Sequence, residues 1–467
     1  MDQPSFRRGI ARVTTAASFG FALVQLDVTI VNVALPRIAA DLHTGVAGLQ
    51  WVVDAYALAF AVLLLGMGYL GDRLGSRKVY LSGMALFALA SMLCGFATNA
   101  VLLIVGRTLQ GVGAAAMLPC SLALLSHATA HEHALRARAV GWWTAAGSIS
   151  IAAGPIIGGL LISVMNWRSI FFVNVPVCVV GAWLTLRVPE TELKAQHRHF
   201  DLPGQLLVIL AVTGLTMAVI EAHPLGWMHP LVLTCLAMVL VAAPLFVLVE
   251  SRSPAPMLPL HFFKAPGFSA AVVYGMVMNF SYYGIVFLLS LYLQRVHGYS
   301  ALHTGLAYLP LTATFFGVNI FSGWLVGRTG ARLPMVLGAL IDCAGFGLFL
   351  LLGAESPYLL MLPAFALLPA GMGLGVPAMT TTVLCAVEKE ASGTASGVLN
   401  SARQAAGAMG VALFGSLVGD GNNRVVAGLH LSSWISVALL LMAAALAYRC
   451  IAPIVISKSS KLEAADY

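Results

Sequence analysis

Residues 49–78 read LQWVVDAYALAFAVLLLGMGYLGDRLGSRK, an apolar run that passes directly into a short basic loop containing glycine. A helix needs about 20 apolar residues to cross a lipid bilayer. Runs of this length recur along the whole chain, and they lack the alternation of apolar and polar residues that membrane β-strands show. Because backbone groups in lipid must be hydrogen-bonded within a helix or a closed barrel, the sequence predicts an all-α integral membrane protein.

The composition of the chain agrees with this fold class. Hydrophobic residues make up 60% of the 467 residues and charged residues only 9%, whereas soluble domains carry about 25% charged residues. The seven cysteines are scattered and form neither a CxxC motif nor a Cys/His cluster. We therefore expect no disulfide framework and no metal site.

Hydropathy divides the chain into fourteen predicted spans. With the N-terminus inside, nineteen of the 25 Lys and Arg residues fall in cytoplasmic loops, four fall outside and two lie within spans. This asymmetry favours an even number of spans with both termini in the cytoplasm, and it explains the net charge of +7 without nucleic-acid binding. The predicted spans are 13–34, 49–70, 79–98, 101–125, 138–163, 168–187, 203–222, 229–249, 268–293, 302–326, 334–353, 358–384, 395–418 and 430–452.

An internal repeat divides the spans into two halves. Residues 68–77 and residues 323–332 share five identities at an offset of 255. Parallel repeats of this kind build transporters whose substrate site lies near the midplane between the halves. We expect a six-helix bundle in residues 1–200, two inserted helices and a linker in 201–265, and a second six-helix bundle in 266–467.

Ionisable residues inside the predicted spans are candidates for function, because a charge in lipid is costly unless it faces protein or water. Asp27 lies halfway along the first span, and Arg107, in the fourth, is its natural partner. A carboxylate that can approach or leave an arginine is suited to binding and releasing a proton. The alternative is a permanent ion pair that only fixes helix packing. If the pair couples protons to transport, we expect it to face a chamber between the bundles.

Further polar residues are candidates for substrate or proton binding. Asp54 lies near the start of the second span, in the segment WVVDAY that also contains Tyr56. Asp342 lies in the eleventh span, where it suits a cationic substrate, a second proton or an interhelical hydrogen bond. Arg403 lies in the thirteenth span. Its side chain either snorkels to the cytoplasmic interface or has a structural or gating role. The other candidates for lining a substrate cavity are Asn279, Asn319 and Tyr282.

Four motifs lie in order on the expected spans: LDVTIVNVALP at 26–36, GYLGDRLGSRK at 68–78, RTLQGVG at 107–113 and GPIIGG at 154–159. Together they resemble the motifs of the major facilitator superfamily, specifically its fourteen-helix drug:proton antiporters of the QacA/EmrB type. The resemblance covers nearly the whole chain and is most specific in residues 26–160. It implies the major facilitator fold, with two six-helix bundles and two inserted central helices.

The resemblance also implies roles for these motifs. It assigns proton coupling to Asp27 and Arg107, and antiport rather than symport to the fifth-span motif. It also implies that the loop at residues 68–78 forms a latch between helices at the cytoplasmic face. The latch residues are Gly68, Asp72, Arg73, Gly75 and Arg77. The fifth-span motif forms a hinge, because proline removes a backbone hydrogen bond and small residues admit a close helix; its residues are Gly154, Pro155, Gly158 and Gly159.

The sequence therefore predicts a transporter rather than an enzyme. We expect a monomer in the inner (plasma) membrane that exports hydrophobic or cationic organic compounds by alternating access, with no cofactor other than the proton gradient. The alternative is the same fold acting as a symporter or as the exporter of a specific metabolite. A membrane-embedded enzyme or receptor is a remote alternative, since no catalytic motif and no soluble domain is visible. The sequence does not reveal an adaptor protein.

Overall fold

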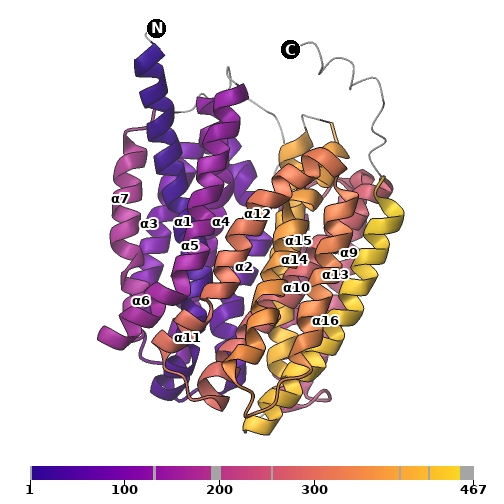
Figure 1. The fold of residues 1–467 in the computed structure, drawn as a ribbon. Helices are drawn as coiled ribbons and strands as arrows, with labels where there is room; N and C mark the ends of the chain where they lie inside the picture. The colour runs from indigo at the N-terminus through magenta and orange to yellow at the C-terminus, as the bar shows by residue number, and fades with distance from the viewer. Residues whose placement is uncertain are drawn as a thin grey trace.

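The computed structural model describes residues 3–129, 133–190, 201–253, 256–388, 391–418 and 421–452. These residues form long, roughly parallel helices and no β-strand (Figure 1). Thirteen helical segments in this part of the chain are long and apolar enough to span a membrane. A further helix, Ser392–Ser416, occupies the place of the thirteenth predicted span but is less apolar. The prediction of a helical membrane protein is confirmed.

The helices before residue 190 pack together on one side of the molecule (Figure 1). Asn99 begins one of them, because its side-chain oxygen accepts a hydrogen bond from the amide of Leu102 at 2.9 Å, which satisfies a donor that the first helical turn leaves free. We call the helices before residue 190 the first bundle. Its helices are α1 (Gln3–Leu42), α2 (Val46–Leu74), α3 (Ser76–Gly95), α4 (Ala100–Ala128), α5 (His133–Val164), α6 (Ser169–Phe172) and α7 (Asn174–Leu186).

The helices after residue 256 form the second bundle on the other side (Figure 1). Its first long helix continues into a π-helical turn, one of its spans is interrupted between α11 and α12, and α14 contains three prolines. The elements are η1 (Leu260–Lys264), α10 (Pro266–Leu291), η2 (Tyr292–Val296), α11 (Ala301–Ala307), α12 (Leu309–Thr329), α13 (Arg332–Phe349), α14 (Tyr358–Cys385), α15 (Ser392–Ser416) and α16 (Asn422–Cys450).

Two helices, α8 (Leu202–Leu225) and α9 (Pro230–Arg252), form a hairpin between the bundles in sequence. Helix α8 packs against α2 and α15, while α9 packs on α8. Two hydrogen bonds fasten α8 to α2: the indole of Trp51 donates to Glu221 at 2.8 Å, and the amide of Gln205 donates to the carbonyl of Val62 at 2.5 Å. The hairpin is thus joined by side-chain hydrogen bonds to the first bundle at both ends of α8.

The two copies of the internal repeat adopt the same local structure. Gly75 ends α2 with φ of 99°, and Gly330 ends α12 with φ of 77°. In each case the glycine amide donates to the carbonyl four residues earlier. Because a side chain strains the backbone at such positive φ values, glycine at both positions has a physical reason.

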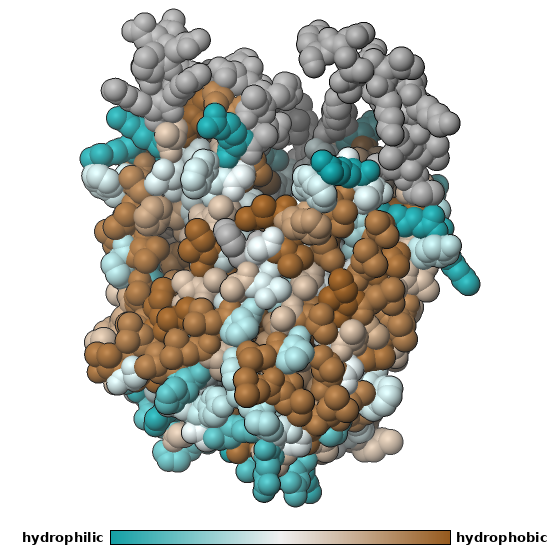
Figure 2. Space-filling model, in the orientation of Figure 1, coloured by the Kyte–Doolittle hydropathy of each residue, from teal (hydrophilic) through white to brown (hydrophobic). Residues whose placement is uncertain are grey.

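Surface hydropathy divides the molecule into a middle and two ends. In Figure 2 hydrophobic side chains cover the sides, and hydrophilic ones gather at the two ends. Helix α1 begins and α16 ends at the same end (Figure 1), which we call the terminal end; α1 ends at the opposite, distal end. A polytopic helical protein in lipid has this distribution.

The two bundles are joined at the distal end. One hydrophobic core runs from the last turns of α1 and the first turn of α2 into the ends of α10 and α15. The amide of Gln50 donates to the carbonyl of Ala412 at 2.5 Å, and that of Gln294 donates to the carbonyl of Val33 at 3.1 Å. Helices α5 and α11 touch through backbone, because a Cβ on Gly159 would lie 2.8 Å from the carbonyl oxygen of Ala301. The molecule is therefore closed at this end.

Candidate functional site

Asp27 and Arg107 form a salt bridge inside the first bundle. The pair joins α1 to α4, and its side chains are 0% and 2% exposed. Two amides hold the other carboxylate oxygen, with Asn174 donating at 2.9 Å and Gln110 at 3.3 Å. A buried ion pair is stable only when its remaining polar atoms are also bonded, and here the carboxylate meets that condition.

Arg107 is held by several further contacts. Its Nε donates to the carbonyl of Val52 at 3.0 Å, and one terminal nitrogen donates to Gln110 at 2.8 Å. The guanidinium carbon lies 4.4 Å from the centre of the Tyr56 ring, a cation–π contact. Helices α1, α2, α4 and α7 thus meet at this one charge pair. Tyr56, predicted to bind substrate, lies beside the pair in the interior of the bundle.

A small cavity lies between the two bundles. The first bundle contributes Thr29, Asn32, Ile151 and Pro155 to its wall. The second contributes Tyr282, Tyr283, Val286, Tyr308, Leu311 and Thr312. Tyr282 was predicted to line such a cavity.

The ion pair does not line this cavity. Helix α1 carries Asp27 on the face turned into the first bundle and carries Thr29 and Asn32 on the cavity wall. The expectation that Asp27 and Arg107 face a chamber between the bundles is therefore not met in this conformation. The sequence alone cannot distinguish these two faces of α1, because both are apolar except for single polar residues.

Asp54 lies on α2, two turns into the helix. It is 0% exposed, and neither of its carboxylate oxygens has a hydrogen-bond partner. It follows Gln50 by one helical turn on the face of α2 that packs on α15, and further along the same face the side chain of Leu65 contacts Gly397. A buried carboxylate without a partner is costly when ionised, so Asp54 suits this place only as the neutral acid or when a cation approaches.

Asp342 lies inside the second bundle, where α13 and α14 cross at their glycines. It is 1% exposed, its oxygens have no hydrogen-bond partner, and its backbone touches Gly371. Asn279 donates to the carbonyl of Gly275 in its own helix at 2.9 Å, and Asn319 lies against Gly373 of α14. None of these three belongs to the cavity wall described above.

The predicted latch joins the start of α3 to the end of α7. Arg77 donates to the carbonyl of Leu186 at 2.6 Å and lies 4.0 Å from Glu190. Gly75 makes the turn between α2 and α3, while Gly68, Asp72 and Arg73 lie in the last turns of α2. These contacts are within the first bundle.

The predicted hinge packs on both bundles. Gly154 lies against Thr29 and Gly158 against Ile30 of α1, so these two glycines admit the neighbouring helix of the same bundle. Gly159 and Pro155 instead face α11, where the carbonyl of Pro155 lies against Gly305. The motif therefore brings α5 close to helices of both bundles.

Comparison with known proteins agrees with this architecture. The family described as Major Facilitator Superfamily matches residues 17–411. Multidrug resistance protein Stp of Mycobacterium tuberculosis is 39% identical over 86% of this chain and 75% of its own length. The methylenomycin A resistance protein of Bacillus subtilis is 36% identical over 87% of both chains. The tetracenomycin C resistance and export protein of Streptomyces glaucescens is 36% identical over 86% of this chain and 75% of its own length.

A solved structure supports the fold. The crystal structure of a point mutant of the nucleoside transporter NupG superposes with a TM-score of 0.68 over 94% of this chain and 99% of its own, at 12% identity. Identity at this level supports the fold alone. Together with the family match and the similar resistance proteins, the two bundles and their central cavity show that this chain belongs to the major facilitator superfamily, as the resemblance to its drug:proton antiporters predicted.

Proposed function

We propose that this protein is a proton-driven exporter of small organic compounds, acting as a monomer in the inner (plasma) membrane. Its relatives are named for resistance to, or export of, antibiotics. The excess of Lys and Arg in alternate loops supports a cytoplasmic position for both termini. With that orientation the distal end faces outward, and the closed distal end corresponds to a conformation that receives substrate from the cytoplasm.

The ion pair does not face the cavity in this conformation, but its place on α1, a helix that also lines the cavity, is the single observation that carries the proposal of proton coupling. Helix α1 holds Asp27 on one face and two residues of the cavity wall on the other. Protonation of Asp27 removes its attraction to Arg107 and frees α1 to move relative to α4. The same movement shifts Thr29 and Asn32 at the cavity. Proton and substrate then act on opposite faces of one helix and do not compete for one carboxylate.

Asp54 is the second proton site in this mechanism. It lies on the surface of α2 that meets α15, where rocking of the bundles changes its surroundings. In the outward-facing state water reaches this surface and allows the acid to exchange its proton. The two bundles are the parts that move. The latch at Gly75 and Arg77 holds helices of the first bundle together, and the hinge at Pro155 lies where α5 contacts the second bundle.

Transport by purified protein in liposomes tests the proposal. We expect gradient-driven efflux of an antibiotic panel by the wild type, and at least a tenfold loss of coupled transport for Asp27→Asn and for Arg107→Ala. Substrate addition must move protons in the direction opposite to substrate. Normal coupled transport by both variants contradicts the proton-coupling mechanism, and substrate and protons moving together contradict antiport.

A further inference from the structure

The second copy of the internal repeat, residues 323–332, keeps two arginines of the first copy and lacks its acid. Arg328 and Arg332 stand where the first copy also has arginines, but Gly327 stands where the first copy has Asp72. The two arginines lie on either side of the turn between α12 and α13, at the terminal end of the second bundle (Figure 1). The second copy therefore carries a local excess of positive charge.

The arginine at the start of the helix that follows the loop has an acidic partner in the first copy only. Arg77 lies 4.0 Å from Glu190, which follows the last helix of the first bundle. Its counterpart Arg332 lies at the last helix of the second bundle, with its guanidinium carbon 4.0 Å from the centre of the Tyr448 ring. Among the described residues, neither Arg332 nor Arg328 has a side-chain ion pair or hydrogen bond. Both guanidinium groups therefore have donors available for an anion.

Each of these two arginines stacks on an exposed aromatic ring. The guanidinium carbon of Arg328 lies 4.2 Å from the centre of a Trp324 ring, and Trp324 and Tyr448 are 50% and 61% exposed. Tryptophan and tyrosine are enriched where a membrane meets water, which is also the depth of the lipid headgroups. Stacking leaves the N–H groups in the plane of a guanidinium able to bind a phosphate through two parallel hydrogen bonds.

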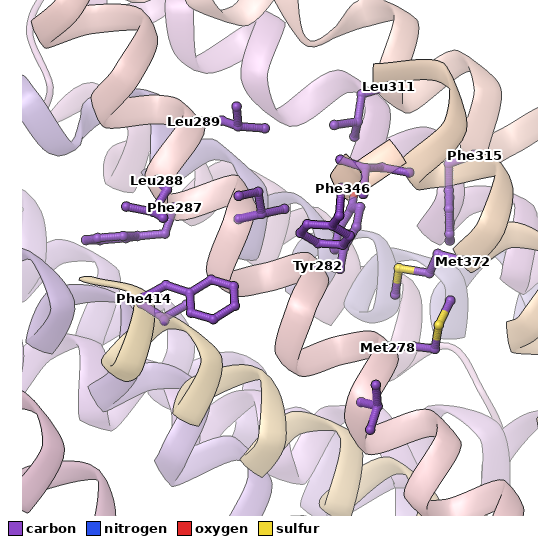
Figure 3. Close-up of a cluster of buried hydrophobic side chains, with 14 of the residues drawn as sticks. Met278, Tyr282, Phe287, Leu288, Leu289, Leu311, Phe315, Phe346, Met372 and Phe414 are labelled. Atoms are coloured by element: carbon purple, nitrogen blue, oxygen red, sulfur yellow. The ribbon is translucent and has the colours of Figure 1, made fainter. Parts of the chain in front are cut away.

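Exposed leucines continue from the loop along the outer face of α13. Leu333, Leu337 and Leu340 are exposed, and their spacing of four and three residues puts them on one face of the helix. The opposite face is turned inward, where Figure 3 shows Phe346 among the buried side chains of the core. Phe321 is exposed on the neighbouring α12. An apolar surface next to unpaired arginines fits an amphiphile better than a free anion.

We propose that an anionic phospholipid binds at this loop, with its phosphate on Arg328 and Arg332 and its acyl chains along the exposed leucines of α13. Anionic headgroups attract basic side chains at the membrane surface. The phosphate supplies the negative charge that the second copy lacks and that Asp72 and Glu190 supply in the first. The site shares no residue with the cavity wall, and the proposal does not depend on the proposed export function.

Native mass spectrometry of the purified protein tests the site with phosphatidylglycerol and phosphatidylcholine of the same acyl chains. We expect the wild type to bind phosphatidylglycerol at least tenfold more tightly. The variant Arg328→Gln/Arg332→Gln should reduce this preference to less than threefold, whereas Arg12→Gln, at an exposed arginine of the same end in the first bundle, should keep it. Equal binding of the two lipids by the wild type overturns the proposal, and so does a tenfold preference in the double variant. Displacement of the lipid by an equal concentration of inorganic phosphate also overturns it.

Restoring the acid of the first copy tests whether its absence creates the site. Nothing beyond the helix itself would lie within 4 Å of a Cβ on Gly327, so Gly327→Asp and Gly327→Ala should both fold. We expect Gly327→Asp to weaken phosphatidylglycerol binding at least threefold, because the carboxylate pairs with the arginines, and Gly327→Ala to bind as the wild type does. Equal affinities of the two variants contradict the proposal. Since this assay involves no transport, neither result bears on the proposed export function.

Discussion

Removing Arg107 should destabilise the protein strongly, and removing Asp27 with it should restore most of the lost stability. In Arg107→Met the carboxylate of Asp27 stays buried, with only Asn174 and Gln110 as donors. Breaking a buried pair costs about 3–5 kcal/mol, because an uncompensated charge remains. Each amide donor to a charged group returns about 1.5–3 kcal/mol at most. Both amide bonds persist in the variant and continue to stabilise the carboxylate. We therefore expect a loss of stability near the lower limit, about 3 kcal/mol.

The double variant Asp27→Leu/Arg107→Met places apolar groups of similar volume where the pair was. Such replacements are often neutral or stabilising. The amide of Gln110 keeps its bond to Ser91 at 2.7 Å, while the carbonyl of Val52 loses the Arg107 donor, which costs about 1 kcal/mol. We therefore expect the double variant to lie within about 1 kcal/mol of the wild type, although it should not transport.

Equilibrium unfolding in mixed detergent and SDS micelles, followed by tryptophan fluorescence, measures these free energies. The double-mutant cycle should give a coupling energy of at least about 2 kcal/mol, because the two groups are in contact. Additive losses from Asp27→Leu and Arg107→Met would refute the argument that burial of an unpaired charge dominates. Retention of coupled transport by the double variant would instead refute a role for the pair in coupling.

Three further predictions concern the contacts between helices. Gly305→Ala should reduce transport at least tenfold, because its Cβ would collide with a backbone carbonyl of α5, whereas Gly317→Ala, with open space around it, should transport normally in the same efflux assay. Gln50→Ala removes two hydrogen bonds to α15, worth about 1–2 kcal/mol, so spin labels across the distal end should show a larger open population. Trp51→Phe removes the bond to Glu221, and we expect about 1 kcal/mol lower stability in SDS unfolding; an unchanged value would mean that this bond does not fasten α8.

The sequence alone predicts the helical membrane fold, because a bilayer leaves the chain few choices. Spans such as 49–70 and 358–384 are visible from apolar length, and the structure has α2 and α14 there. The repeat at Gly75 and Gly330 is also readable, since both turns need positive φ. Helix α15 shows the limit of hydropathy: it has the polar residues Asn400, Arg403 and Gln404, because protein rather than lipid surrounds most of it.

The candidate residues were found because an ionisable side chain stands out among apolar ones, whereas their surroundings could not be predicted. Asp27, Asp54 and Asp342 look alike in the sequence. Only packing decides that the first meets Arg107 and two amides, that the second lies on the face of α2 that packs on α15, and that the third meets α14. Asn174 escaped notice, because a single asparagine at the start of a helix carries no periodic signal.

Local sequence thus determined where the chain crosses the membrane and which side chains are too polar to face lipid. Tertiary structure decided which face of each helix meets the cavity. The physical reason is that transfer from water to lipid depends on each segment alone, whereas the surroundings of a side chain depend on helices that are distant in sequence. Tyr282 and Tyr283 are adjacent, yet their placement beside Thr29 and Asn32 results from the closed contact of two bundles.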